Sequence, residues 1–383
     1  MRILLIDVAT HLGGDQKSFI DLCSALHASR SVQVAAAVAS GPVYDALKPT
    51  GIPLYPLDPA VIKPGNRGIL AWLVSLFSSS EDPIRQAIHD FKPDIVHANT
   101  YEAMKLIPDL PRKRLLFWSV TGLRLSWTET VATASRCTRI IAGSTALDEF
   151  LGTALPTAYC GRVRVIRNAL NTQVFKPGNK ELARKAFQLP SDLPVIGLVA
   201  DLIPWKRHTL FLEMAKIILQ QSPAVQFVIA ARPYSTEHEI YEKKFREQIA
   251  SFIPSENLYW LESVNQTELL LPAFDLLVHP AFGEPSGRAV SEAMATEIPV
   301  IAFDSGAIRD LITQRKDGIL IRSDDPKEFA REALRLLADP ALSAPMAMEA
   351  RLAVLKAFTK EEIAQRMIVE YKNAIAAETE TTK

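Results

Sequence analysis

Two glutamates, Glu284 and Glu292, lie eight positions apart around a stretch that can turn from a loop into a helix. Between them, Ser286 is the expected N-cap of that helix, and Gly287 lets the backbone approach a ligand closely. The amide groups at a helix N-terminus point outward and can donate to an anion. The spacing therefore predicts a site for a phosphate or for a negative charge that develops during a reaction.

The spacing also indicates that the two acids contact different parts of one long ligand. If 286–296 is one helix, Glu292 lies roughly 9 Å along its axis from the cap, and Glu284 lies beyond the cap in the other direction. A glycosidase pair instead needs carboxyl groups about 5 to 9.5 Å apart across one bond. The alternative is that Glu284 is a loop charge and Glu292 a solvated helix residue, although the small apolar neighbours of Glu292 favour a packed face.

A basic pair precedes a second predicted helix. Lys206 and Arg207 follow the strand-like run 195–200 and come directly before a helical pattern over about 209–220. A cation beside oriented amide groups can hold a diphosphate, whereas the alternative is a basic pair on the surface. Asp201 lies nearby and would repel a phosphate unless Arg207 or Arg288 neutralises it.

The first half of the chain has candidate ligand-binding residues where predicted strands end. Gly13 and Gly14 follow the run 3–7, and His97 ends the run 94–97. The carboxyl ends of parallel strands meet at one edge of the sheet, where open α/β sheets bind ligands. The alternatives are a plain turn for the glycines and a structural, hydrogen-bonded role for His97.

Strand-like apolar runs alternate with helical patterns, which is typical of parallel sheets with crossover helices. Strands are expected at 3–7, 32–38, 94–97, 115–121, 140–144 and 163–166, and then at 195–200, 226–231, 258–261, 276–279, 300–303 and 318–321. A proline-containing hinge is expected over 178–193. The pattern predicts an α/β protein with two domains, 1–178 and 190–359, and a disordered polar tail over 378–383.

The composition excludes several classes of protein. The chain has 43 basic and 43 acidic side chains, so no overall basic field would attract nucleic acid. The three cysteines, Cys23, Cys137 and Cys160, are odd in number and lack metal-like spacing, which indicates thiols in a reducing compartment. No run approaches the 18 or so apolar residues that a membrane-spanning helix needs. We therefore expect a cytoplasmic protein without a nucleic-acid partner.

The segment 68–80, GILAWLVSLFSSS, is the most apolar helical pattern in the chain. It is either a buried helix or an interfacial segment that dips into a bilayer beside Lys63 and Arg67, which would meet anionic lipid. The second alternative would place the protein peripherally on the cytoplasmic membrane face and would suit a lipid acceptor.

The segment around Glu284 and Glu292 resembles the E-x7-E signature of retaining GT-B glycosyltransferases of family 4, which use sugar nucleotides to build glycolipids, polysaccharides and small glycosides. The similarity continues through EAMA at 292–295 and IPVI at 298–301. Other similar segments lie at 94–99, 168–177, 201–207 and 304–310. The resemblance implies the GT-B fold, in which two Rossmann-like domains face each other across a cleft and a C-terminal helix, here 360–377, packs back on the first domain.

The resemblance also implies a reaction: a nucleotide-diphosphate sugar is the donor, a lipid, glycan or small-molecule hydroxyl is the acceptor, the anomeric configuration is retained, and no metal or other cofactor is required. Glu284 would contact the sugar hydroxyls, Lys206 would offset charge on the leaving phosphate, and His97 would contact the acceptor or the sugar. These three are the implied catalytic residues. The implied donor-binding residues are Arg207, Glu292, Ser286, Gly287, Arg288, Val264, Gly13 and Gly14.

Three of the departures from the family pattern keep other hypotheses open. Asp201 replaces an arginine, Ala200 replaces a glycine, and Thr121 stands where many relatives carry a histidine or an arginine. One alternative is a degenerate family member that binds a nucleotide sugar or a partner without transfer. Another is a GT-B enzyme of a different reaction type, such as a sugar-nucleotide epimerase or a phosphorylase.

Overall fold

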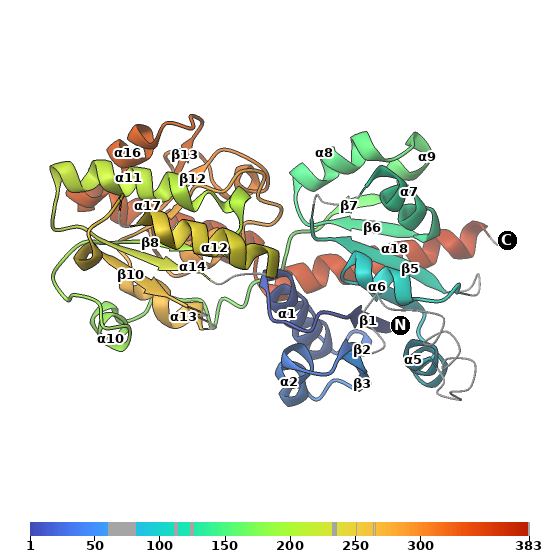
Figure 1. Cartoon of the computed structure of the whole chain (residues 1–383). Helices are drawn as coiled ribbons and strands as arrows, with labels where there is room; N and C mark the ends of the chain where they lie inside the picture. Colours follow the sequence, from blue (N-terminus) through green and yellow to red (C-terminus); the bar gives the residue numbers. More distant parts are fainter. Residues whose placement is uncertain are drawn as a thin grey trace. The chain divides into compact units, whose positions relative to one another are not determined.

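The computed structural model describes residues 1–59, 82–110, 114–122, 126–231, 236–249, 251–262, 264 and 266–381. The chain divides into two compact units, one of Met1–Ala169 with Lys360–Lys383 and one of Leu170–Thr359 (Figure 1). Each unit is built on a parallel sheet, so the prediction of two Rossmann-like α/β domains is confirmed. The apolar segment predicted over 68–80 lies outside the described residues.

The sheet of the first unit has seven parallel strands in the order β3-β2-β1-β4-β5-β6-β7. Its strands are β1 (Arg2–Asp7), β2 (Gln33–Ala39), β3 (Leu54–Leu57), β4 (Ile95–Ala98), β5 (Leu115–Val120), β6 (Arg139–Ala142) and β7 (Val163–Val165). Most residues of β1 and β4 are buried, as expected for central strands that are covered on both faces. The strand order reverses between β1 and β4, and an open sheet binds ligands at such a point.

Helices from both ends of the chain cover this sheet. They are α1 (Gly14–Ala28), α2 (Pro42–Leu47), the short 3₁₀ helix η1 (Lys48–Thr50), α5 (Pro83–Phe91), α6 (Tyr101–Leu106), α7 (Trp127–Arg136), α8 (Thr145–Ala154), α9 (Thr157–Cys160) and α18 (Lys360–Thr381). The last helix, α18, packs against α1 and places Ile363, Met367 and Tyr371 in the core of this unit. The predicted disordered tail is wrong up to Thr381, because alanine and glutamate after position 375 continue the helix without a glycine or proline to end it.

The sheet of the second unit has six parallel strands in the order β10-β9-β8-β11-β12-β13. Its strands are β8 (Val195–Val199), β9 (Gln226–Ala230), β10 (Leu258–Leu261), β11 (Leu276–His279), β12 (Val300–Phe303) and β13 (Ile319–Ile321). Its helices are α10 (Lys180–Ala186), η2 (Pro204–Lys206), α11 (His208–Gln221), α12 (Thr236–Ile249), η3 (Ser255–Asn257), α13 (Thr267–Leu270), η4 (Leu271–Ala273), α14 (Arg288–Ala295), α15 (Ile308–Leu311), α16 (Pro326–Ala338) and α17 (Pro340–Ala357). Here the order reverses between β8 and β11.

The predicted hinge over 178–193 belongs to the second unit, and the units instead meet in sequence at 169–170 and at 359–360. The physical reason is α10, whose Arg184 is buried in this unit. Its guanidinium donates to Asp275 at 2.7 Å and to the carbonyl of Ala273 at 3.0 Å. These bonds attach the segment to the second unit.

Two further expectations concern the membrane and the thiols. No helix in the described part of the chain is long and apolar enough to cross a membrane. Cys23, Cys137 and Cys160 are all free cysteines, and the first two are buried.

The packing of β8 generates a stability prediction at Gly197, where an added Cβ would overlap the ring of Phe274. Gly197→Ala should therefore lower the free energy of unfolding by about 1–3 kcal/mol, because the core must shift to admit the methyl group. Urea denaturation of the full chain measures this change. Gly152→Ala, in an exposed turn of α8 with open space around it, is the control and should be neutral or stabilise by up to about 1 kcal/mol. Equal stability of the two variants would contradict this packing.

Candidate functional site

The loop between β11 and α14 carries Glu284, and the loop after β12 holds its backbone in place. The amide of Ala307 donates to the carbonyl of Glu284 at 2.7 Å, and the amide of Gly283 donates to Ser305 Oγ at 2.9 Å. Gly306 has φ 58° and lies directly against the backbone of Glu284, where a Cβ would overlap it. A glycine is thus required at this position, and the contact fixes Glu284 at the carboxyl edge of the sheet.

The carboxylate of Glu284 is buried and meets three donors. Lys206 Nζ donates to Oε2 at 2.5 Å, His279 Nε2 lies 3.0 Å from the same oxygen, and the amide of Gly287 donates to Oε1 at 3.1 Å. Burial raises the pKa of Glu284, but the charge of Lys206 and the hydrogen bond from His279 together outweigh it and hold the pKa well below its usual value. The group is therefore ionised at neutral pH, and the alternative of a plain loop charge is wrong.

His279 belongs to the same cluster, although the sequence pattern did not single it out. Its ring is 1 % exposed, and this burial lowers its pKa by more than the neighbouring Glu284 raises it. The ring is therefore neutral at neutral pH, and because an ionised carboxylate only accepts, Nε2 must carry the proton. His279 orients the carboxylate while Lys206 balances its charge. The available signal was a histidine at a strand end, five positions before Glu284.

The start of α14 differs from the prediction. The helix begins at Arg288 with Gly287 as its N-cap, so the prediction that Ser286 caps it is wrong. Gly287 has φ 67°, in the left-handed region that favours glycine, and a Cβ there would overlap the side chain of Leu311. The carboxylate of Glu284 accepts the hydrogen bond from the N-cap amide, and it thereby links Lys206 to the helix N-terminus.

Glu292 lies on the buried face of α14, so the alternative of a solvated helix residue is wrong. Its Oε1 accepts from Arg288 Nε at 2.7 Å, and its Oε2 accepts from Thr267 Oγ1 at 3.1 Å. Arg288 therefore compensates the charge of Glu292 one turn along the helix. Thr267 was not singled out from the sequence, because only the fold brings α13 beside α14.

Lys206 and Arg207 are adjacent in sequence but have different partners. Lys206 joins the Glu284 cluster and also lies 4.1 Å above the ring of Trp205. Arg207 is the N-cap of α11, and its guanidinium contacts Asp324 at 2.7 Å and lies 4.8 Å from the ring centre of Phe303. Neither residue is a plain surface charge, because both are mostly buried.

Val264, which was predicted to bind the donor, makes apolar packing contacts in the structure. It follows β10, is partly buried, and packs against the hydrophobic core that includes β12. Its neighbours at 263 and 265 lie outside the described residues, and its predicted place beside the nucleotide base stays a prediction.

In the first unit, His97 is buried between two side chains. Its Nδ1 lies 2.6 Å from the hydroxyl of Tyr371, and its Nε2 lies 2.8 Å from Ser119 Oγ. Burial lowers the pKa of His97 to about 3, so the ring is neutral. Both ring nitrogens are occupied by protein, which matches the structural alternative for His97. Ser119, and not His97, lines the neighbouring pocket, and the contact of His97 with the acceptor or the sugar stays a prediction.

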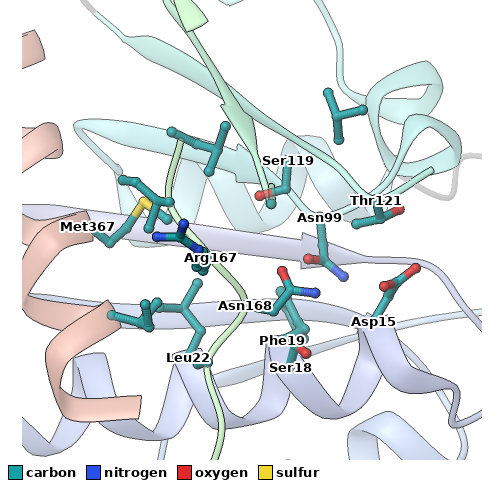
Figure 2. A pocket seen from close by; sticks show the side chains of 16 residues that line it. Asp15, Ser18, Phe19, Leu22, Asn99, Ser119, Thr121, Arg167, Asn168 and Met367 are labelled. Carbon is teal, nitrogen blue, oxygen red and sulfur yellow. The ribbon is translucent and has the colours of Figure 1, made fainter. Parts of the chain in front are cut away.

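A pocket of about 30 Å³ lies at the carboxyl edge of the first sheet (Figure 2). This volume holds one or two water molecules. Gly13 is the N-cap of α1 and Gly14 its first residue, and together they place the first turns of α1 beside the pocket. The polar lining residues are Asp15, Ser18, Asn99, Ser119, Thr121, Arg167 and Asn168. Ser119 is half-buried and connects the pocket to His97.

The second unit resembles a known family. Residues 179–353 match the family Glycosyl transferases group 1. A D-inositol 3-phosphate glycosyltransferase of Thermobispora bispora is 28% identical over 184 residues, which are 47% of this chain and 43% of that protein. A poly(ribitol-phosphate) alpha-N-acetylglucosaminyltransferase of Staphylococcus aureus is 27% identical over 179 residues, or 45% of this chain and 34% of that protein. The chain thus spans less than half the length of these curated relatives.

A solved structure resembles nearly the whole chain. It is Alr3699/HepE of Anabaena in complex with UDP and glucose, with a TM-score of 0.80 and 21% identity over 97% of this chain and 99% of that chain. Together with the two parallel α/β sheets, this similarity shows that the fold is GT-B.

The Lys206–Glu284 pair predicts a dependence of stability on pH. Lys206→Met leaves a buried carboxylate without its cation, and the free energy of unfolding at pH 7 should fall by about 3 kcal/mol. In the wild type the depressed pKa of Glu284 contributes stability above the unfolded-state pKa of about 4.3, and this contribution is lost as the pH falls. As the pH falls, the difference between the two proteins should therefore narrow below the pKa of Glu284 in the variant, because burial raises this pKa and the opposing cation is gone.

Chemical denaturation at several pH values measures this difference. Lys216→Met, at an exposed position of α11, is the control and should change the stability by no more than about 0.5 kcal/mol. If the Lys206→Met protein were as stable as the control at pH 7, the Lys206–Glu284 pair would contribute nothing to the free energy of unfolding.

Proposed function

Because residues 179–353 match Glycosyl transferases group 1, we propose that the protein is a retaining glycosyltransferase of family 4. It transfers a sugar from a nucleotide-diphosphate sugar to a hydroxyl group of a lipid, a glycan or a small molecule, and it requires no metal. The observation that carries the proposal is the buried cluster in which Lys206 and the N-terminus of α14 meet at Glu284.

The cluster suits the charge that develops during sugar transfer. As the bond between the anomeric carbon and the phosphate oxygen breaks, negative charge grows on the leaving nucleoside diphosphate. The ammonium group of Lys206 and the outward amides of α14 stabilise this charge. This pair of contributions takes the place that a divalent cation has in metal-dependent enzymes, which supports metal-independent transfer.

Glu284 acts in this proposal as an acceptor and not as an acid. Its pKa is held well below the usual value, so it has no proton to give at neutral pH. Its carboxylate instead accepts hydrogen bonds from the sugar hydroxyls and orients the ring. The acceptor hydroxyl attacks the anomeric carbon on the face that the phosphate leaves, and its proton passes to the departing phosphate oxygen, which gives retention.

The other predicted residues have supporting roles in the donor site. Glu292, held by Arg288 and Thr267, binds the ribose hydroxyls, and the backbone around Val264 contacts the base. Arg207 and Gly287 complete the surroundings of the diphosphate. In the first unit, Gly13 and Gly14 bring α1 to the donor sugar or the acceptor, and His97 acts through Ser119.

The names of the relatives support a polyol acceptor and a uridine nucleotide donor. Two relatives are named for acceptors that are phosphorylated polyols, and the GT-B neighbour holds UDP and glucose. We propose that the protein works in the cytoplasm in cell-envelope or polysaccharide synthesis. Peripheral membrane contact through 68–80 stays a prediction.

The donor is identified by a thermal-shift screen against nucleoside diphosphates and their sugars. A ligand at 100 times its dissociation constant should stabilise the protein by about 2.7 kcal/mol. We expect transfer from the stabilising nucleotide sugar to a polyol phosphate, unchanged after treatment with EDTA, with the anomeric configuration of the donor retained in the NMR spectrum of the product. Binding without any transfer would favour the degenerate alternative, and an inverted product would contradict the mechanism.

Variants of the cluster test the roles of its members. Lys206→Gln and Glu284→Gln should each lower kcat about 100-fold or more, because each removes a charge at the reaction centre. The release of nucleoside diphosphate measures the rate, under conditions in which circular dichroism shows that the variants are folded. Lys216→Gln is the control and should transfer at the wild-type rate. If either variant transferred at the wild-type rate, the residue substituted in that variant would have no part in the mechanism.

A further inference from the structure

Three side chains, joined by hydrogen bonds, form a row from the core of the first unit to its pocket. Tyr371 on α18 contacts His97 on β4, and His97 contacts Ser119 on β5, at 2.6 and 2.8 Å. Tyr371 is fully buried and His97 is 2 % exposed, whereas Ser119 lines the pocket. The atom that carries the proton in each of these two hydrogen bonds decides whether Ser119 offers a ligand a donor or only an acceptor.

Burial of the Tyr371 hydroxyl fixes the positions of these protons. In the described ranges of the chain its only hydrogen-bond partner is Nδ1 of His97, and a buried hydroxyl that fails to donate costs about 1–3 kcal/mol. Tyr371 therefore donates to Nδ1, which carries no proton. The ring of His97 is neutral, so its single proton is on Nε2 and is donated to Ser119. The proton of Ser119 is then left to point into the pocket.

Asn99 provides a matching acceptor on the neighbouring strand. β4 and β5 pair in register with His97 opposite Phe117, so that Asn99 and Ser119, each two positions further on, lie on the same face of the sheet. The amide nitrogen of Asn99 donates to Asp7 Oδ2 at 2.5 Å, which leaves Oδ1 as the acceptor. Both side chains line the pocket (Figure 2). These two side chains thus offer the pocket one donor and one acceptor.

We propose that Ser119 and Asn99 form a recognition pair for one hydroxyl group of the ligand. Ser119 donates to the hydroxyl oxygen, and the hydroxyl donates to Asn99 Oδ1. A hydroxyl can do both, whereas an ionised phosphate or an ether oxygen only accepts. A volume of about 30 Å³ admits a group of this size. His97 and Tyr371 are positioning residues that set Ser119 as the donor. The inference rests on the proposed function only in identifying this hydroxyl as part of the glycosyl acceptor.

The positions of the protons are tested by NMR of the full chain with ¹⁵N-labelled histidine. The signals of His97, one of seven histidines, are those lost in His97→Gln or, should that variant not fold, those moved by Ser119→Ala. We expect a protonated Nε2 and an unprotonated Nδ1 from pH 5 to 8. Tyr371→Phe removes the donor to Nδ1 and should abolish this single tautomer, which a purely packing role of Tyr371 would not do. A protonated Nδ1 in the wild type would overturn the proposal.

The hydroxyl preference is tested with two small probes, ethylene glycol and 1,2-dimethoxyethane. Ethylene glycol should shift the His97 signals in a saturable way, and dimethoxyethane, which can accept from Ser119 but cannot donate to Asn99, should bind about tenfold more weakly. In Ser119→Ala the apparent affinity for ethylene glycol should fall about tenfold, as expected for one lost hydrogen bond. Equal responses to both probes, or an unchanged response in Ser119→Ala, would overturn the pair. Neither measurement uses turnover, so their failure leaves the proposed transfer reaction standing, and a failed transfer assay leaves the hydroxyl site standing.

Discussion

The edge of the second sheet depends on how the buried charge of Glu284 is compensated. An ionised carboxylate inside a protein is costly unless a cation and further donors replace the water that it loses. Glu284 has Lys206, His279 and the N-cap amide of α14 as these donors, and each comes from a different element. Because η2, β11 and α14 must all present a donor to the same two oxygens, the carboxylate fixes how these elements meet at the edge of the sheet. Gly306 completes this arrangement by allowing the next loop to pack on the backbone of Glu284.

Each unit has a buried, neutral histidine that orients a neighbouring side chain without adding a charge. Burial lowers the pKa of His279 and of His97, so each ring has one donor nitrogen and one acceptor nitrogen. His279 gives its proton to a carboxylate, while His97 passes a hydrogen-bond direction from Tyr371 to Ser119. The same residue type therefore stabilises a charge in one unit and orders a hydroxyl in the other, and the difference lies in the partners that the fold supplies.

The sequence predicted the architecture better than the contacts, for a physical reason. Buried parallel strands are continuous apolar runs, and all twelve expected strands are present, while the short β3 was missed. The cap of α14 was misassigned, because Ser286 has the right chemistry but Gly287 has the backbone conformation that the turn needs. The partner of His97 could not be found, since Tyr371 lies 274 positions away and only packing of α18 brings it near. A local pattern records periodicity, but it does not record which side chains meet across the fold.

The Lys206–Glu284 pair also constrains how the proposed donor site can bind its ligand. If a diphosphate draws Lys206 toward itself, Glu284 keeps the donors of His279 and Gly287 but loses its cation, and removing one partner of a buried pair costs about 3–5 kcal/mol. A nucleoside diphosphate alone offers Glu284 no donor in return. A nucleotide sugar does, because the hydroxyl groups of the sugar can donate to the carboxylate at the same moment as the phosphate attracts the lysine. On the proposed mechanism, binding of the phosphate and binding of the sugar are therefore coupled through the Lys206–Glu284 ion pair. The intact nucleotide sugar is the ligand that offers partners to both Lys206 and Glu284.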